Sequence, residues 1–318
     1  MKLKNAMALG LASVLAVGLT ACGSSADTSA ASPAADSTAA ESTVAAADAA
    51  ESTVAAADAA GAPDGDGDPT TLTVAMECAY APYNWTQSDD SNGAVEIRGS
   101  SDYAYGYDVM MAKKIGEALG QKVQIVKLDW DSLIPAVMSG DVDCVIAGQS
   151  ITAERAAQVD FSDPYYYASI ITLTKKDSAY ANAASVADLA GATATSQLGT
   201  IWYDTCLPQI ENANILPAQE TAPAMLVALN SGACDIVVTD RPTGQAALVA
   251  YPDFTLLDFG GGDGDFQVSD EDINIGISMK KGNTALKDAI NEVLATMTTD
   301  DYNALMDEAI SVQPLSDN

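Results

Sequence analysis

The sequence predicts an α/β protein of two similar lobes joined by two crossover strands. From Thr70 onward, short apolar segments alternate with segments of helical spacing, which is typical of a mostly parallel sheet covered by helices on both faces. One helix–turn–strand unit occurs twice, at 133–148 and at 225–240. The copies are too far apart for a solenoid repeat, so we expect one copy in each lobe.

The N-terminal segment has the layout of a secretory signal. Lys2 and Lys4 precede an apolar run over residues 6–19 that is shorter than a typical membrane span. The run ends in LTAC, which resembles a bacterial lipobox and would make Cys22 the lipidated first residue of the mature chain. Residues 1–22 are therefore predicted to be a lipoprotein signal peptide. The alternative is a leader that is simply removed, which leaves Cys22 without a role.

Residues 23–69 form an acidic segment without Lys, Arg or aromatic residues. The sequence ESTVAAADAA occurs there twice in tandem, at 41–50 and at 51–60. Such a composition cannot bury enough apolar surface to fold, so we expect a disordered tether. The folded part would then be extracytoplasmic, anchored to the outer face of the cell membrane by the lipid on Cys22.

The first lobe is predicted from residues 70–167 together with 273–318. Its expected early elements are strands at 71–77, 122–128 and 143–148 and helices at 106–120 and 131–140. Two further helices would close this lobe, at 284–297 and at 302–310, because their apolar residues recur on one stripe.

The second lobe is predicted over residues 168–272. A long β-prone run at 165–176 would carry the chain into it, and the segment 272–282 would carry the chain back. We expect the two lobes to close on a ligand about these two crossings.

The composition argues against several classes of function. With 44 acidic and 14 basic residues, the chain has a net charge of −30, which disfavours nucleic acid and anionic lipid as partners. It contains no His, which removes Ser-His and Cys-His catalysis and His-based metal sites. Acidic tracts at 64–69 and 261–272 do not keep the calcium-loop pattern, so neither a metal nor a cofactor is expected.

The cysteines after the tether are expected to be free buried thiols. They lie in or beside apolar segments and show no framework spacing, although an exported protein permits disulfides. These residues are Cys78, Cys144, Cys206 and Cys234.

Arg155 raises the question of what its guanidinium binds. It is one of three arginines in the chain and follows an apolar run, and a half-buried guanidinium is costly without a negative partner. It lies one turn into a helix that begins near Thr152, and a helix N-terminus also offers unpaired N–H groups to an anion. The partner is therefore either the carboxylate of a ligand or a carboxylate of the protein, Asp160 or Asp163.

Other expected strand ends also carry polar or aromatic side chains. In open α/β sheets, ligands bind beyond the carboxyl ends of strands. Glu77 ends the first strand and Tyr80 follows it, although both residues also suit an ordinary strand-end turn. Asp240 ends a strand of the second lobe, where it could receive an ammonium group, cap the helix that begins at Arg241, or do both.

The stretch TSQLGTIW, residues 195–202, is a second candidate anion site or else an ordinary strand–helix turn. Gly199 would allow close approach of the backbone, and Trp130 and Trp202 supply aromatic faces. Taken together, the strand ends supply groups for a carboxylate and for cations. This combination predicts an amino acid zwitterion held between the two lobes.

Several motifs resemble the family-3 solute-binding proteins, which deliver polar amino acids to ABC transporters. SITAERAAQVDFSDPYY, residues 150–166, resembles the family pattern S-x-T-x-x-R followed by D-F-[ST]-x-P-Y. The segments 106–120 and 133–148 and the LGT turn at 198–200 resemble further family motifs, and the likeness runs over 72–309. The resemblance implies a periplasmic-binding-protein-like fold of type II, the Venus flytrap. It also implies a monomer that works with an ABC permease and its ATPase.

The resemblance also implies roles at the backbone end of the ligand. Arg155 and Thr200 would bind the α-carboxylate, Ser150 and the backbone of Gly148 would contact the ligand, and Asp240 would take the α-ammonium. The full set of expected ligand-binding residues is Glu77, Tyr80, Trp130, Gly148, Ser150, Arg155, Thr200, Ile201, Trp202 and Asp240.

At the side-chain end, the resemblance places Tyr80 and Trp130 on either side of the ligand and Glu77 at its tip. Ile201 and Trp202 stand where many members have small or polar residues, so the identity of the amino acid stays open. Glu77 favours a cationic or polar side chain, because two carboxylates repel each other.

The sequence leaves two alternative functions open. Some proteins of this architecture are cyclohexadienyl dehydratases with a glutamate base, and Glu77 could take that role. A sensor module is the other alternative. Sensors on this fold usually continue into a membrane span and a signalling domain, whereas this sequence ends at Asn318, shortly after its last expected helix.

Overall fold

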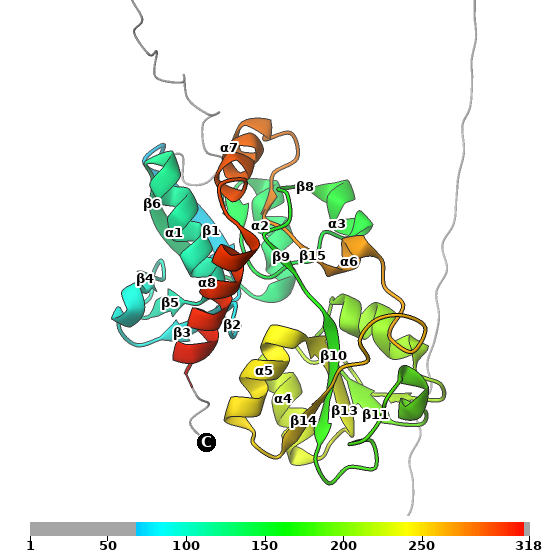
Figure 1. Ribbon diagram of the computed structural model, residues 1–318. Coiled ribbons are helices and arrows are strands. Elements are labelled where there is room, and N and C mark those ends of the chain that lie inside the picture. Colours follow the sequence, from blue (N-terminus) through cyan, green and yellow to red (C-terminus); the bar gives the residue numbers. More distant parts are fainter. Residues whose placement is uncertain (1–67, 315–318) are drawn as a thin grey trace, which may run out of the picture. The chain divides into compact units, whose positions relative to one another are not determined.

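The computed structural model describes residues 68–314, and Figure 1 shows their course. The predicted signal peptide, Cys22 and the tether up to residue 67 lie outside the described residues. Within the described part, no helix is long and apolar enough to cross a membrane.

Lobe 1 is built on a five-stranded sheet of order β6-β1-β7-β16-β8. Its strands are β1 (Thr71–Met76), β6 (Lys122–Lys127), β7 (Cys144–Val145), β8 (Asp160–Phe161) and β16 (Ser278–Met279). β1 pairs in parallel with β6 and β7, while β16 runs antiparallel to both β7 and β8. The predicted strands at 71–77, 122–128 and 143–148 are confirmed, although only two residues of the last one pair in the sheet.

Lobe 2 is built on a second five-stranded sheet, of order β12-β11-β13-β10-β14. Its strands are β10 (Ile170–Lys175), β11 (Thr193–Thr195), β12 (Asn214–Ile215), β13 (Ile236–Asp240) and β14 (Phe254–Leu257). β11 is parallel to β12 and β13, but β10 is antiparallel to β13 and β14. Four of the five strands in each sheet run in the same direction, so the expectation of mostly parallel sheets is confirmed. Both sheets are mixed, because the strand that follows each crossing, β10 or β16, enters its sheet in the opposite direction.

The two crossings lie side by side. The strand β9 (Tyr166–Tyr167) pairs antiparallel with β15 (Asn274–Ile275), and Figure 1 shows them between the two sheets. β9 connects β8 of lobe 1 to β10 of lobe 2, and β15 precedes β16 on the return. This is the predicted two-lobed architecture with two crossover strands. The lobe boundaries at 167/168 and 272/273 stay a prediction.

The helices begin and end largely where local signals place them. They are α1 (Tyr107–Leu119), α2 (Leu133–Ser139), α3 (Ala153–Gln158), α4 (Ala222–Ser231), α5 (Arg241–Ala250), α6 (Asp270–Ile273), α7 (Thr284–Leu294) and α8 (Thr299–Val312). Gly120 ends α1 with a left-handed φ of 68°, and the Thr152 side chain caps α3. α8 begins three residues earlier than predicted, because Thr298 and Asp301 form a capping box.

Residues 79–105 form a small sheet that the sequence did not predict. Its order is β2-β3-β5-β4, with β2 (Ala79–Tyr80), β3 (Asn84–Gln87), β4 (Val95–Glu96) and β5 (Tyr103–Tyr105). Residues 68–314 also contain short 3₁₀ and π helices at Ser91–Gly93, Trp130–Ser132, Val186–Leu189, Trp202–Cys206 and Leu207–Gln209. Trp85 and Tyr105 pack edge to face in this sheet, with ring centroids 5.5 Å apart.

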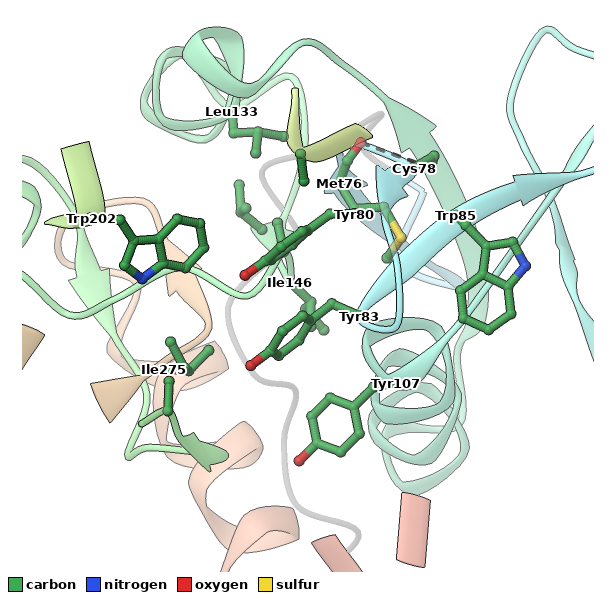
Figure 2. Packing of buried hydrophobic residues seen from close by; sticks show 14 of the residues in the cluster. Met76, Cys78, Tyr80, Tyr83, Trp85, Tyr107, Leu133, Ile146, Trp202 and Ile275 are labelled. Carbon is green, nitrogen blue, oxygen red and sulfur yellow. Dashed lines mark hydrogen bonds between the residues drawn. The ribbon is translucent and has the colours of Figure 1, made fainter. Parts of the chain in front are cut away.

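Aromatic side chains form a row in the interior beside the small sheet. Figure 2 shows the rings of Tyr80, Tyr83 and Tyr107 one after another, with Trp202 beside Tyr80. Tyr80 and Tyr83 are stacked, with ring centroids 4.8 Å apart, and Tyr107 meets Tyr83 edge to face. This row places aromatic surface at the end of β1.

The cysteines of the described part are free and buried, as predicted. Burial raises the pKa of each thiol, in Cys78, Cys206 and Cys234 to about 12. These thiols therefore stay protonated at neutral pH and contribute to the apolar packing.

Candidate functional site

Arg155 connects the two lobes through neutral acceptors. It lies on α3, where Nη1 donates to the Ser150 carbonyl at 3.0 Å and Nη2 donates to the Gly199 carbonyl of lobe 2 at 2.9 Å. Its Cζ atom is 5.4 Å from the ring centroid of Trp130, in cation–π range. Burial lowers the pKa of this guanidinium, and the more distant carboxylates of Glu154, Asp204 and Asp272 oppose this shift only in part.

Neither Asp160 nor Asp163 is the partner of Arg155. Asp160 pairs instead with Lys281 at 3.3 Å and accepts a hydrogen bond from the Gly282 amide at 2.7 Å. Within residues 68–314, Arg155 forms no ion pair with a carboxylate. The alternative of an internal carboxylate partner was therefore wrong for both aspartates.

Asp240 is buried at the end of β13 and makes two hydrogen bonds. Its Oδ1 accepts from the Thr243 amide at 2.8 Å and so caps α5, as one of the alternatives predicted. Its Oδ2 accepts from the Tyr80 hydroxyl of lobe 1, a contact between the lobes that the sequence did not predict. Burial nevertheless raises the pKa of Asp240 to about 6, and within residues 68–314 it forms no ion pair.

Glu77 follows β1 and is only 4% exposed. Its oxygens accept weak hydrogen bonds from Gln197 Nε2 of lobe 2 at 3.2 and 3.4 Å. Burial raises the pKa of Glu77 to about 7, well above its usual range. Gln197 was not predicted as a site residue, although it lies two positions before Gly199 in the quoted turn.

The backbone at Gly148 packs closely against the Tyr80 ring. Its φ is +63°, and a Cβ there would lie 2.8 Å from Tyr80 Cε1, so only glycine fits. Its amide donates to the Tyr165 hydroxyl at 3.0 Å, and that hydroxyl donates to Asp108 at 2.6 Å. Asn84 donates to the other oxygen of Asp108 at 2.7 Å. This buried network fixes the backbone at Gly148.

Asp108 was missed as a site residue, although it belongs to the quoted segment 106–120. It is fully buried, and burial raises its pKa to about 6. Its partners lie 24 and 57 residues away along the chain, so only the tertiary fold brings them together.

The turn after β11 places the remaining predicted residues. Thr200 Oγ1 donates to the Gln197 carbonyl at 2.7 Å, and Trp130 Nε1 donates to the Gly199 carbonyl at 3.4 Å. Ile201 and Trp202 are buried, and the Trp202 ring lies 6.0 Å from that of Tyr80. The Gly199 carbonyl therefore accepts hydrogen bonds from two lobe 1 side chains, Trp130 and Arg155.

The sequence profile of the bacterial extracellular solute-binding proteins, family 3, matches residues 72–311. The chain belongs to this family. Its two-lobed fold agrees with the type II fold that the motifs implied.

Curated relatives of this family-3 protein match over part of their lengths. The chain is 35% identical over 130 residues to the arginine-binding extracellular protein ArtP of Bacillus subtilis, covering 41% of this chain and 45% of that protein. It is 30% identical over 186 residues to a probable histidine-binding protein of Campylobacter jejuni, covering 58% of this chain and 66% of that protein. Each match thus spans less than two thirds of the relative.

A solved structure matches over nearly its whole length. The ancestral amino acid-binding protein AncCDT-1, described as a precursor of cyclohexadienyl dehydratase, is 30% identical to the chain with a TM-score of 0.61. The match covers 76% of this chain and 96% of that protein.

In this family-3 protein, a cavity of about 300 Å³ lies next to Glu77 and Trp130. Its lining is strongly acidic and comes from both lobes, with three further carboxylates from Asp129, Asp131 and Glu220. The electrostatics of this cavity favour a cation and disfavour an anionic side chain. A second pocket of about 620 Å³ also has Trp130 in its lining, together with Arg155, Thr200 and Ile201.

Proposed function

We propose that this chain is the lipid-anchored substrate-binding protein of an ABC importer, and that it binds an amino acid with a cationic side chain between its lobes. The proposal rests on the hydrogen-bond partners of Arg155. Its guanidinium bridges the lobes without a carboxylate partner in the described residues, while two buried carboxyls, Asp240 and Glu77, lack a cation. One zwitterion with a second positive charge would satisfy all three groups.

The bound ligand would replace contacts that the two lobes make with each other. The α-carboxylate would take the place of the Gly199 carbonyl at Arg155, with a bidentate pair replacing one hydrogen bond. The α-ammonium would take the place of the Tyr80 hydroxyl at Asp240. The side chain would extend along Trp130 toward Glu77 and release Gln197.

A cationic side chain is favoured over other polar ones by the cavity beside Glu77. Its carboxylates, among them Asp131 and Glu220, surround the predicted position of the side-chain tip. The arginine-binding and histidine-binding relatives support the same class of ligand. The two lobes would close about β9 and β15, and the closed form would then be recognised by a permease.

A panel of the twenty amino acids tests the ligand class. We expect arginine, lysine or histidine to raise the thermal midpoint and to change the fluorescence of Trp130 and Trp202, because these rings lie at the exchanged contacts. A ligand at about 100 times its Kd should add about 2.7 kcal/mol to the free energy of unfolding. Glutamate and aspartate serve as controls of similar size and opposite charge, and should give no response.

The panel needs protein that has been unfolded and refolded, so that no ligand is carried over from expression. A response to acidic or apolar amino acids alone would overturn the cationic assignment, and a flat panel would overturn amino acid binding altogether.

A dehydratase is the second candidate function. The pKa of Glu77, about 7, suits a general base, and AncCDT-1 is described as a precursor of an enzyme of that kind. Incubating the refolded protein with cyclohexadienyl acids separates the two functions. We expect no product, whereas conversion that is lost in Glu77→Gln would favour the enzyme.

Cys22→Ser tests the proposed anchor. We expect this variant to leave the membrane fraction almost completely, because no acyl chain can then be attached and the described part has no membrane-spanning helix. Ser24→Ala is the matched control and should fractionate like the wild type. Retention of Cys22→Ser on the membrane would rule out lipidation at this residue.

A further inference from the structure

A second interlobe pocket lies apart from the proposed amino acid site. Its volume is about 430 Å³, and none of the predicted ligand-binding residues lines it. Lobe 1 contributes the residues on either side of Tyr80, Ala79 and Ala81. Lobe 2 contributes α4 and α5, and the residues after α8 complete the wall.

Most of the lining is apolar and includes two aromatic rings. Trp85 comes from lobe 1, and Leu226 and Tyr251 come from lobe 2, together with several alanines of α4 and α5. An apolar cavity of roughly 150 Å³ is already large enough to hold benzene. This pocket can therefore accommodate an aromatic ring together with a polar substituent.

The lining residues include one cation, Lys127, and no Asp or Glu. Lys127 donates to Thr86 Oγ1 at 2.9 Å and forms no ion pair within the described residues. Gln313 Nε2 is buried and has no hydrogen-bond partner among the described residues. Buried donors without acceptors are costly. A carboxylate, which only accepts hydrogen bonds, would satisfy them.

We propose that this pocket is a second binding site, for a small carboxylic acid with an aromatic or branched apolar body. The carboxylate of the ligand pairs with Lys127 and accepts a hydrogen bond from Gln313. The apolar body of the ligand lies between Trp85 and the helices α4 and α5. Because both lobes line the pocket, the ligand stabilises the lobes in the arrangement that the structure shows. The site does not depend on the amino acid function proposed above.

The test is a ¹⁹F NMR titration of the full chain with 4-fluorophenylacetate, without amino acids. We expect saturable broadening with a Kd of about 1 mM or tighter. The neutral amide, 4-fluorophenylacetamide, has almost the same shape and should bind about tenfold more weakly, because it lacks the charge that pairs with Lys127. Lys127→Gln should remove this preference for the acid.

Two variants on α4 locate the site. Leu226→Trp fills the pocket from a half-buried position and should abolish the broadening. Val227→Trp adds the same ring at a neighbouring residue that is 54% exposed and does not line the pocket, so it should bind like the wild type. Circular dichroism confirms that both variants are folded.

Three results would overturn the proposal. The first is broadening that does not saturate, and the second is broadening that survives Leu226→Trp. The third is binding only in a chain shortened to end at Pro314, which would show that residues 315–318 occupy the pocket instead. Equal binding of the acid and the amide would overturn the assignment of a carboxylate ligand.

Discussion

Arg155→Ala should weaken amino acid binding by about 30-fold to several thousand-fold. Removing one partner of a buried, hydrogen-bonded charge pair costs about 2–5 kcal/mol, and each 1.4 kcal/mol corresponds to about tenfold in Kd. The unliganded protein should lose little stability, because Arg155 there bonds only to the carbonyls of Ser150 and Gly199. Isothermal titration calorimetry and thermal unfolding measure the two quantities separately.

Arg98→Ala is the matched control for this variant. Arg98 is exposed, and its side chain donates only to Gln124, at 3.4 Å, so its removal should leave binding unchanged. Arg155→Lys should bind at an intermediate level, since a lysine keeps the charge but loses the bidentate fork. Binding by a folded Arg155→Ala variant at wild-type affinity would show that the carboxylate is held elsewhere.

The unliganded protein should be more stable at about pH 5 than at about pH 8, by on the order of 5 kcal/mol in total. Burial raises the pKa of Glu77 from 4.5 to about 7, and that of Asp108 and Asp240 from 3.8 to about 6. A raised pKa means that the folded state holds the proton more tightly than the unfolded state. The stabilisation is complete below about pH 4 and is lost as the pH rises through 6 and 7.

Urea unfolding followed across this pH range measures the effect. Glu77→Gln should flatten the slope between about pH 5 and pH 7, because it removes the group with the highest of these carboxyl pKa values. Glu96→Gln changes an exposed glutamate of the small sheet and should leave the slope unchanged. If the stability of the wild-type protein rises from pH 5 to pH 8, these carboxyls do not hold their protons more tightly in the folded, unliganded protein than in the unfolded state.

The raised pKa values also make the affinity for the ligand depend on pH. A cationic amino acid pairs with the ionised forms of Asp240 and Glu77, so binding at about pH 6 should release protons and become tighter as the pH rises. Calorimetry in buffers of different ionisation enthalpy detects this release directly. Proton uptake on binding of arginine or lysine would contradict the proposed positions of the two positively charged groups of the ligand.

Local signals explain how much of the fold could be predicted. The alternation of 71–77 and the glycine stop at Gly120 are properties of neighbouring residues, and both are confirmed. The antiparallel direction of β10 and β16 was not predicted, because it depends on how the chain enters each sheet from the other lobe. The small sheet of 79–105 was missed because its short strands carry little periodicity of their own.

In the candidate site, too, local features could be predicted from the sequence and long-range contacts could not. Arg155 and Asp240 could be proposed from their positions at a helix start and a strand end, which are local features. The Tyr80–Asp240 contact joins residues 160 positions apart, and the Glu77–Gln197 contact joins residues 120 apart. Such contacts follow from how the lobes meet, which no local pattern encodes.

The strand order of lobe 1 has a consequence for the way this chain reaches its folded state. β16 lies inside the sheet, between β7 and β8, although it follows the whole of lobe 2 along the chain. All the strands of lobe 2, in contrast, come from one continuous segment. During synthesis, which starts at the N-terminus, the chain can therefore assemble the complete sheet of lobe 2 first. Lobe 1, although it begins earlier, keeps an open gap in its sheet until β16 (Ser278–Met279) has emerged.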